Sequence, residues 1–160
     1  MSIFETVLSD ASVAIEWLEE EDDPAKRRIL YTAAISLLYA VSDTMDRDEA
    51  DHVRAFIQGA RLVWKQESLD WESGRSEKFN WFYDFIRAER HKVIHEAIHS
   101  HSGDASIPVV SFGVQEAGFS ELQSDIYWPL TEGPLEGIDA RDALKDALDW
   151  WKRELQALSS

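Results

Sequence analysis

The sequence predicts an all-α fold, an up-and-down bundle of four to five helices with a loop or short β-hairpin excursion before the last helix. Two observations lead to this class. Apolar residues recur at helical spacing over several long stretches, and Gly and Pro are scarce, with 7 and 4 among 160 residues. The length fits a single domain over residues 1–160, and the 44% of apolar residues are enough to bury a core.

The first two helices are expected over residues 3–18 and 24–41, separated by the acidic run 19–23. Asp23 followed by Pro24 is typical of an N-cap and the first residue of a helix. The stretch from 30 to 41 is almost wholly apolar, so the second helix is expected to be the central and most buried one.

Two further helices are expected in the middle of the chain. Asp46 can cap a third helix that carries apolar residues from 53 to 63. Residues 68–76, with Gly74, are interpreted as a loop. A fourth, long helix is expected from 77 to 100, because this stretch contains no Gly or Pro.

The last part of the chain combines an irregular insertion with a final helix. Residues 100–137 hold most of the Gly and Pro, so they are interpreted as an irregular insertion with a short hairpin. Asp139 is expected to cap the last helix, over 140–158. On that helix, Trp151 is expected in the core, and Trp150 is expected to be partly exposed or at an interface.

The charge and composition exclude several classes of protein. With 16 Lys and Arg against 31 Asp and Glu, the net charge of −15 excludes a uniformly basic nucleic-acid clamp, and neither DNA nor an acidic membrane is an expected partner. The lack of Cys excludes disulfides, thiol catalysis, zinc fingers and iron–sulfur clusters. No signal-peptide features and no apolar run of ~18 residues are present, so a cytoplasmic protein is expected.

Most of the reactive side chains gather on the fourth predicted helix. Four of the five histidines fall within residues 91–101, close to Arg87, Glu89 and Arg90. At about 100° per residue, Arg90 falls inside an apolar stripe, and a second stripe roughly opposite carries three histidines. The apolar stripe is Phe79, Phe82, Ile86, Val93 and Ala97, and the second is Trp81, Asp84, Ala88, His91, His95 and His99. The second face is expected to pack against a partner or to line a cleft.

Residues 82–96, FYDFIRAERHKVIHE, resemble the signature of the HEPN superfamily. Members are small α-helical domains that carry an Arg, four to six further residues and a His late in the bundle, which corresponds here to Arg90 and His95. The resemblance implies a metal-independent RNase or RNA-binding component of a toxin–antitoxin or defence system, without a cofactor. It also implies a homodimer whose two motifs face each other in one cleft, and an antitoxin or other protein as a partner.

The same resemblance implies roles for the reactive side chains. His95 would take part in proton transfer around the attacking 2′-hydroxyl, since a His titrates near neutrality. Arg90 would offset the charge that builds up on the phosphorus oxygens, which a guanidinium matches with two hydrogen bonds. Glu89, His91 and Arg87 would be accessory groups.

The helical positions of Arg90 and His95 add a condition to this hypothesis. They are separated by five positions, and therefore by about 140° around the axis of a straight helix. Arg90 must bend round on its long stem or meet the His95 of a second subunit, which makes dimerisation part of the functional hypothesis. Two other interpretations stay open: an Arg90 paired with an acid of another helix, and a His95 that packs without chemistry.

Two other functions also stay open. The first is a non-catalytic dimeric interaction protein whose acidic surface binds a basic protein partner. The second is a metal-binding helical bundle, because His91, His95 and His99 follow one ridge at four-residue spacing and adjacent pairs can share a metal ion. No native metal site is expected, because the three histidines lie on one helix and such a site usually adds a carboxylate from another helix.

The net charge argues against RNA as a ligand, whereas a local cationic cleft argues for it. Arg87, Arg90 and Lys92 cluster with the histidines, and physiological salt screens repulsion beyond about 8–10 Å. The RNase hypothesis requires Arg90 and His95 to line an open cleft. Burial of both side chains in salt bridges would exclude it.

Overall fold

The computed structural model describes residues 1–99, 129–130 and 133–158. Its elements are α1 (Ile3–Glu20), α2 (Pro24–Asp46), α3 (Asp51–Glu72), the π-helix η1 (Trp81–Arg87), α4 (Ala88–His99) and α5 (Ala140–Leu158). Within these ranges there is no strand, only an isolated antiparallel bridge between Pro129 and Asp139. The predicted all-α helical bundle is therefore confirmed.

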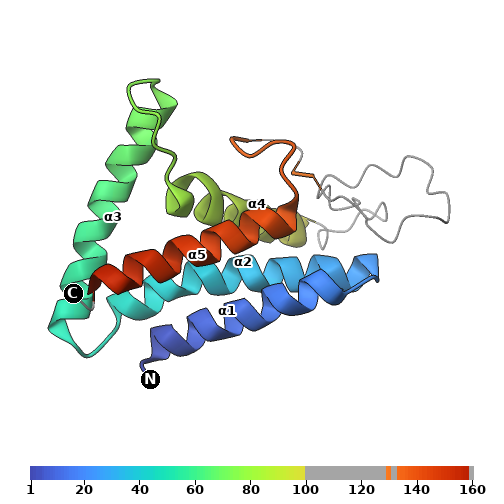
Figure 1. Cartoon of the computed structure of the whole chain (residues 1–160), viewed down its shortest axis with the longest axis horizontal. Helices are drawn as coiled ribbons and strands as arrows, with labels where there is room; N and C mark the ends of the chain where they lie inside the picture. Colours follow the sequence, from blue (N-terminus) through green and yellow to red (C-terminus); the bar gives the residue numbers. More distant parts are fainter. Residues whose placement is uncertain (100–128, 131–132, 159–160) are drawn as a thin grey trace.

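Helix α2 lies at the centre of the bundle, as the sequence predicts. It contacts α1, α3, η1, α4 and α5. Figure 1 shows α1 and α2 side by side and antiparallel, with α5 running along them and α3 standing across one end. The segment formed by η1 and α4 returns from α3: η1 packs against α2, α3 and α5, and α4 then continues along α2.

Side-chain caps fix the starts of two helices where the sequence predicts them. The Asp23 carboxylate accepts hydrogen bonds from the backbone N–H groups of Ala25 (2.8 Å) and Lys26 (3.1 Å), with Pro24 as the first helical residue. These bonds lower the pKa of Asp23 below its ordinary value, since they favour the charged form. At α5, the Asp139 carboxylate accepts a hydrogen bond from the backbone of Arg141 (2.9 Å).

The prediction that Asp46 caps the third helix is wrong. Asp46 is the last residue of α2, and its carboxylate accepts hydrogen bonds from the side chains of Gln58 (3.1 Å) and Arg61 (3.0 Å) of α3. It therefore ties two helices together. Helix α3 begins after Ala50, which makes no side-chain cap.

The predicted loop over 68–76 and the helix start at 77 are also wrong. Helix α3 continues to Glu72, because Ser68 is buried and its hydroxyl donates a hydrogen bond to the Asp84 carboxylate. The chain then turns at Gly74, whose φ of +71° suits a glycine, and the next helix begins only at Trp81. A contact distant in sequence thus buries a segment that the sequence pattern predicts as a loop, and local bonds around Ser73 and Gly74 end the helix.

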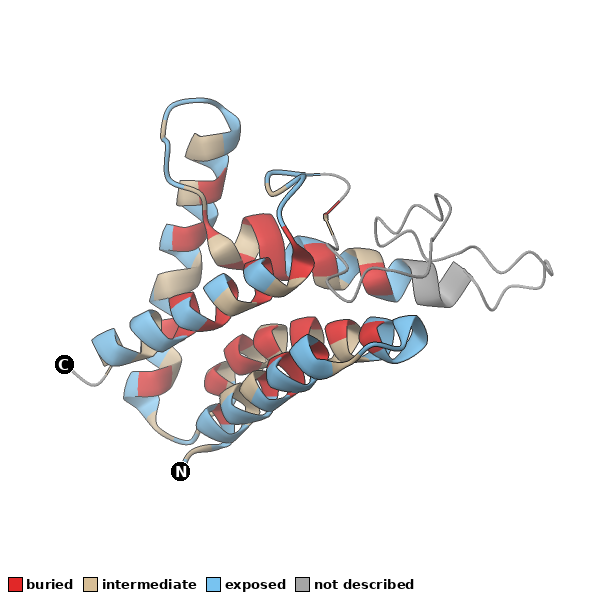
Figure 2. Cartoon of the chain, turned by 45° about the vertical axis from the view of Figure 1, so that its right-hand side comes forward, coloured by how far each residue is buried: buried red, intermediate tan, exposed pale blue. Residues whose placement is uncertain are grey.

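The core is lined by the facing sides of the helices, which Figure 2 shows as buried stripes. Three tryptophans form its aromatic centre: the ring of Trp64 lies 4.9 Å from that of Trp150 and 5.6 Å from that of Trp151. Trp151 is fully buried, as predicted, and its indole N–H donates a hydrogen bond to the carbonyl of Leu38 (2.9 Å). The expectation of a partly exposed Trp150 is wrong, because Trp64 packs against it.

The expected insertion over 100–137, with its hairpin, lies mostly outside the described residues. Its described end is tied together by backbone hydrogen bonds from Leu130 to Ile138 (2.8 Å) and from Gly137 to Leu130 (2.9 Å). This short turn leads directly into the Asp139 cap of α5.

None of the described helices combines the length and the apolar character needed to cross a bilayer.

Candidate functional site

The start of η1 is anchored by a buried polar network. The Asn80 side chain accepts hydrogen bonds from the backbone of Phe82 (3.0 Å) and Tyr83 (3.1 Å). The buried Asp84 carboxylate accepts from the Asn80 backbone (2.8 Å) and from the Ser68 hydroxyl of α3. This network holds a π-helical turn, a conformation that is rare and often found at functional sites.

A ridge of reactive side chains follows η1 and α4 at four-residue spacing. Its members are Tyr83, Arg87, His91 and His95. The Arg87 guanidinium lies over the Tyr83 ring, 5.4 Å from its centroid, and the His91 and His95 rings are 4.8 Å apart. Arg87, His91 and His95 are exposed, so the histidine face of the predicted helix is open at these positions. The backbone of α4 extends to His99, whose side chain is not among those described.

Arg90 lies beside this ridge and faces α2. Its guanidinium stacks over the ring of Tyr39, 4.1 Å from the centroid, and the same ring stacks on Phe82 at 5.6 Å. The side chain is half-buried, and no described residue forms an ion pair or hydrogen bond with it. The alternative interpretation, in which Arg90 pairs with an acid of another helix, is therefore wrong for the described part of the chain.

These groups meet at a cavity of about 440 Å³, which we call the arginine cavity. It is lined by Tyr39, Tyr83, Arg87, Ala88, Arg90 and His91. Two guanidinium groups and an imidazole therefore face one hollow, and none of the described residues that line it carries a carboxylate. His95 does not itself line this cavity, and its ring lies next to that of His91, 4.8 Å away. Arg90 is thus held towards α2, whereas His95 is exposed, and His91 lies between these two motif residues along the helix.

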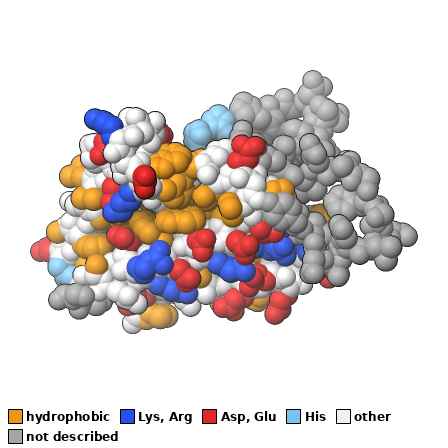
Figure 3. Space-filling view, turned by 45° about the horizontal axis from the view of Figure 1, so that its top comes forward, with side chains coloured by type: hydrophobic (Ala, Val, Ile, Leu, Met, Phe, Trp, Pro, Cys, Tyr) orange, Lys and Arg blue, Asp and Glu red, His pale blue; other side chains and the backbone are white. Residues whose placement is uncertain are grey.

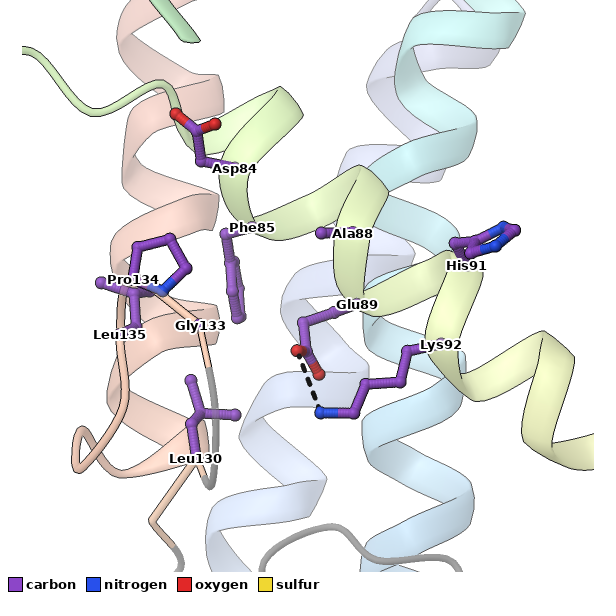
Figure 4. A pocket seen from close by; sticks show the side chains of 10 residues that line it. All are labelled: Asp84, Phe85, Ala88, Glu89, His91, Lys92, Leu130, Gly133, Pro134 and Leu135. Atoms are coloured by element: carbon purple, nitrogen blue, oxygen red, sulfur yellow. Dashed lines mark ion pairs between the residues drawn. The ribbon is translucent and has the colours of Figure 1, made fainter. Parts of the chain in front are cut away.

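Two of the predicted residues lie on the other side of α4. The buried Glu89 carboxylate accepts a hydrogen bond from the Tyr31 hydroxyl (2.9 Å) and pairs with Lys92 (3.7 Å). Figure 4 shows this pair in a second cavity, of about 490 Å³, which shares Ala88 and His91 with the cavity that Arg87 and Arg90 line. Lys92 and Glu89 therefore neutralise each other and do not line the arginine cavity, which leaves Arg87 and Arg90 as its cations.

Replacement of the Tyr31 hydroxyl tests this buried network. We expect Tyr31→Phe to lower the free energy of unfolding by about 1–3 kcal/mol in urea denaturation, because the buried Glu89 carboxylate loses a donor. Tyr83→Phe is the matched control, since no described residue bonds to the Tyr83 hydroxyl. Equal effects of the two substitutions would contradict the assignment.

The same substitution has a pH signature. Burial, and then the charge of Glu89, raise the pKa of Tyr31 well above its ordinary value. The folded state therefore keeps this proton longer than the unfolded chain does, so stability falls as the pH rises above about 10. The alkaline loss of stability is expected to be smaller in Tyr31→Phe than in the parent.

Arg87 and Arg90 of the arginine cavity lack the acidic partners that most basic side chains of the described structure have. On the face drawn in Figure 3, basic and acidic side chains are interspersed. On α5, for example, Lys145 pairs with Asp142 and Lys152 with Asp149, both at 3.2 Å. Arg87 and Arg90 have no such partner among the described residues, and in a chain of net charge −15 this makes them a local positive site.

The described residues contain no group of three or more His, Asp or Glu placed to hold a metal ion. The described part of the histidine ridge is the pair His91 and His95, with ring centroids 4.8 Å apart. The third member of the predicted metal ridge, His99, has its side chain outside the described part, so the metal alternative rests on the pair alone.

The sequence hypothesis missed the aromatic residues that support the site. Tyr39 stands in the apolar stretch of α2, where its spacing resembles that of core positions, and Tyr83 precedes the motif. Their chemistry could have indicated them, because the hydroxyl of a tyrosine on a buried helix requires a polar partner or access to a cavity.

The fold and the site together define an all-α helical bundle with an arginine- and histidine-lined cavity on its fourth helical segment. No protein-family model, curated protein or solved structure matches this chain. The function is therefore inferred from the side chains of the site.

Proposed function

We propose that this chain is a HEPN-like, metal-independent endoribonuclease that acts as a homodimer in a toxin–antitoxin or defence system. One observation carries the proposal. Arg87 and Arg90 line one cavity together with His91, and neither arginine has a carboxylate partner among the described residues. The exposed His95 lies next to His91, and the protein as a whole is strongly acidic. Unneutralised guanidinium groups beside imidazoles are suited to bind and cleave a phosphodiester.

The proposed reaction is an internal transfer at phosphorus. The 2′-oxygen of a ribose attacks the adjacent phosphorus while His95 removes the hydroxyl proton. The bond from phosphorus to the 5′-oxygen breaks, and that oxygen takes a proton from a second, protonated imidazole, a role that we assign to His91 or to the His95 of the other subunit. The products are a 2′,3′-cyclic phosphate and a 5′-hydroxyl, so no metal or other co-reactant is consumed.

Arg90 stabilises the negative charge that develops on the non-bridging oxygens. Its guanidinium is held by the Tyr39 ring, which fixes the plane of the fork while leaving its N–H groups unbonded within the described structure. Such a preorganised donor stabilises the transition state more than the ground state.

The first test is the cleavage of a mixed RNA pool by the full-length protein in the presence of EDTA. We expect EDTA-resistant cleavage, 2′,3′-cyclic phosphate ends and a dimeric mass in light scattering. A dimer that leaves the RNA intact would contradict the nuclease proposal. That outcome would favour the non-catalytic alternative, an interaction protein that binds a basic partner through its acidic surface.

A further inference from the structure

A second hollow continues the arginine cavity towards α3. It has a volume of about 280 Å³ and is lined by Tyr39, Asp43, Arg61, Lys65, Phe82, Tyr83 and Arg87. Tyr39, Tyr83 and Arg87 also line the arginine cavity, so the two hollows form one groove. Its lining extends from Arg90 on α4, through Tyr39 and Tyr83, which line both hollows, to Lys65 on α3. We call its far end, beyond Arg87, the α3 end.

The α3 end holds two cations, Arg61 and Lys65, and both described acids beside it pair with Arg61. Arg61 is held in place by the hydroxyl of Ser42 (2.8 Å), by Asp46 (3.0 Å) and by Asp43 (3.2 Å). Lys65 lies one helical turn further along α3, is exposed, and forms no ion pair within the described residues. Asp43 is the one carboxylate that lines the described groove, and it already pairs with Arg61. Two acids face the single charge of Arg61, so the unpaired Lys65 and Arg87 together leave one positive charge in excess in this part of the groove.

The groove also presents uncharged donors. The hydroxyls of Tyr39 and Tyr83 have no hydrogen-bond partner among the described residues. Together with the Lys65 ammonium and the Arg87 guanidinium, they form a row of donors beside aromatic rings. Phosphate oxygens accept from all of these groups, and single-stranded nucleic acid is bound by such cationic grooves with aromatic and guanidinium faces.

The aromatic rings and the position of the groove favour a strand of RNA over an acidic protein segment, since bases stack on such rings. The α3 end is too small for a duplex, and it shares Tyr39, Tyr83 and Arg87 with the cavity where we place the cleavage reaction. The remaining surface carries the excess of acids, so a polyanion is repelled there and directed to this groove.

We propose that the α3 end of the groove binds the backbone phosphate of a nucleotide next to the cleaved one in single-stranded RNA, with Lys65 as its cation. This subsite rests on the proposed ribonuclease function, and it implies that the enzyme prefers an oligonucleotide to a dinucleotide. Lys65 and Tyr83 position the strand, whereas the chemistry remains with Arg90 and His95.

The test is a binding measurement with an RNA that cannot be cleaved. A fluorescein-labelled 2′-O-methyl 12-mer lacks the attacking hydroxyl, so its fluorescence anisotropy reports affinity alone. We expect Lys65→Glu to weaken binding by about tenfold and to reduce the slope of log affinity against log salt by about one. Lys65 is exposed, so the melting temperature is expected to stay that of the parent.

Lys26→Glu is the matched control, because it makes the same charge change at an exposed position of α2. Lys26 precedes Tyr39 by thirteen positions, which is about 20 Å along the helix axis. We expect its affinity for the 12-mer to stay close to that of the parent. An equal loss in both variants would mean that only net charge matters, and would overturn the subsite.

The outcomes separate the subsite from the nuclease proposal. If Lys65→Glu binds the 12-mer like the parent, or if the parent does not bind it, the subsite is wrong even where the enzyme cleaves RNA. If Lys65→Glu loses binding but the parent cleaves nothing, the subsite holds and the nuclease proposal fails. Displacement of the 12-mer by a poly-Glu peptide of equal length, at similar concentration, would instead identify the groove as a docking site for an acidic protein.

Discussion

His95→Ala is expected to reduce RNA cleavage by about 10²- to 10⁴-fold in kcat, because it removes the group that moves the proton of the 2′-hydroxyl. The fold should be unaffected, since His95 is exposed on α4. The measurement is single-turnover cleavage of a labelled oligonucleotide in EDTA. His52→Ala is the matched control, because His52 is also exposed but lies on α3 at position 52, outside both cavities.

Arg90→Ala is expected to reduce kcat by about 10²- to 10³-fold, as does the loss of one oxyanion donor in other enzymes. Arg90→Lys keeps the charge but loses the fork that matches two phosphate oxygens, so its activity should lie between those of Arg90→Ala and the parent. If Arg90→Ala and His95→Ala both cleave like the parent, the catalytic assignment is wrong. If His91→Ala is the more damaged histidine variant, His91 is the acid or base.

The features of the fold that depend on local chemistry could be predicted from the sequence. Asp23 and Pro24 define the start of α2, and Asp139 the start of α5, because a cap needs only its own next few residues. The apolar stretch of α2 predicted a central helix for a similar reason, since only a helix surrounded by others can bury so many apolar residues.

The predictions that were wrong concern features that depend on contacts between residues distant in sequence. Asp46 looked like a cap, but the side chain of Arg61, fifteen positions later, bonds to its carboxylate. Helix α3 passes through a segment predicted as a loop because Ser68 is buried against Asp84. The π-helical turn of η1 likewise depends on Asn80 and Asp84, and no periodicity in the sequence indicates it.

The candidate site was predicted in part. Arg87, Arg90, His91 and His95 were identified from their helix and their chemistry, and the structure groups them around one cavity and its edge. Glu89 was also identified, but its carboxylate points into a different cavity, because Tyr31 and Lys92 bind it there. The other side of the groove is formed by residues of α2 and α3. Sequence patterns do not indicate which helices pack opposite each other, so this side could not be predicted.

The largest effect on stability is expected at Trp151. This side chain is fully buried, packs against Trp64 and Trp150, and donates a hydrogen bond to Leu38 of α2 (2.9 Å). Trp151→Ala should lower the free energy of unfolding by about 3–5 kcal/mol, measured by urea denaturation, because it removes these contacts and leaves a cavity. Trp17→Ala, at an exposed position of α1, should change it by less than about 0.5 kcal/mol.

Trp151→Ala should also lower the cleavage activity, because a column of contacting aromatic rings connects Trp151 to Arg90. The Trp151 ring lies 6.1 Å from that of Phe82, Phe82 stacks on Tyr39 at 5.6 Å, and Tyr39 carries the Arg90 guanidinium. Trp151→Phe keeps a ring in this column but loses the indole donor, so it should retain more cleavage activity than Trp151→Ala at a temperature where both are folded. If Trp151→Ala is as stable as Trp17→Ala, the packing at the centre of the bundle is wrong. If it is unstable but cleaves at the parental rate while folded, Arg90 does not depend on the column for its position.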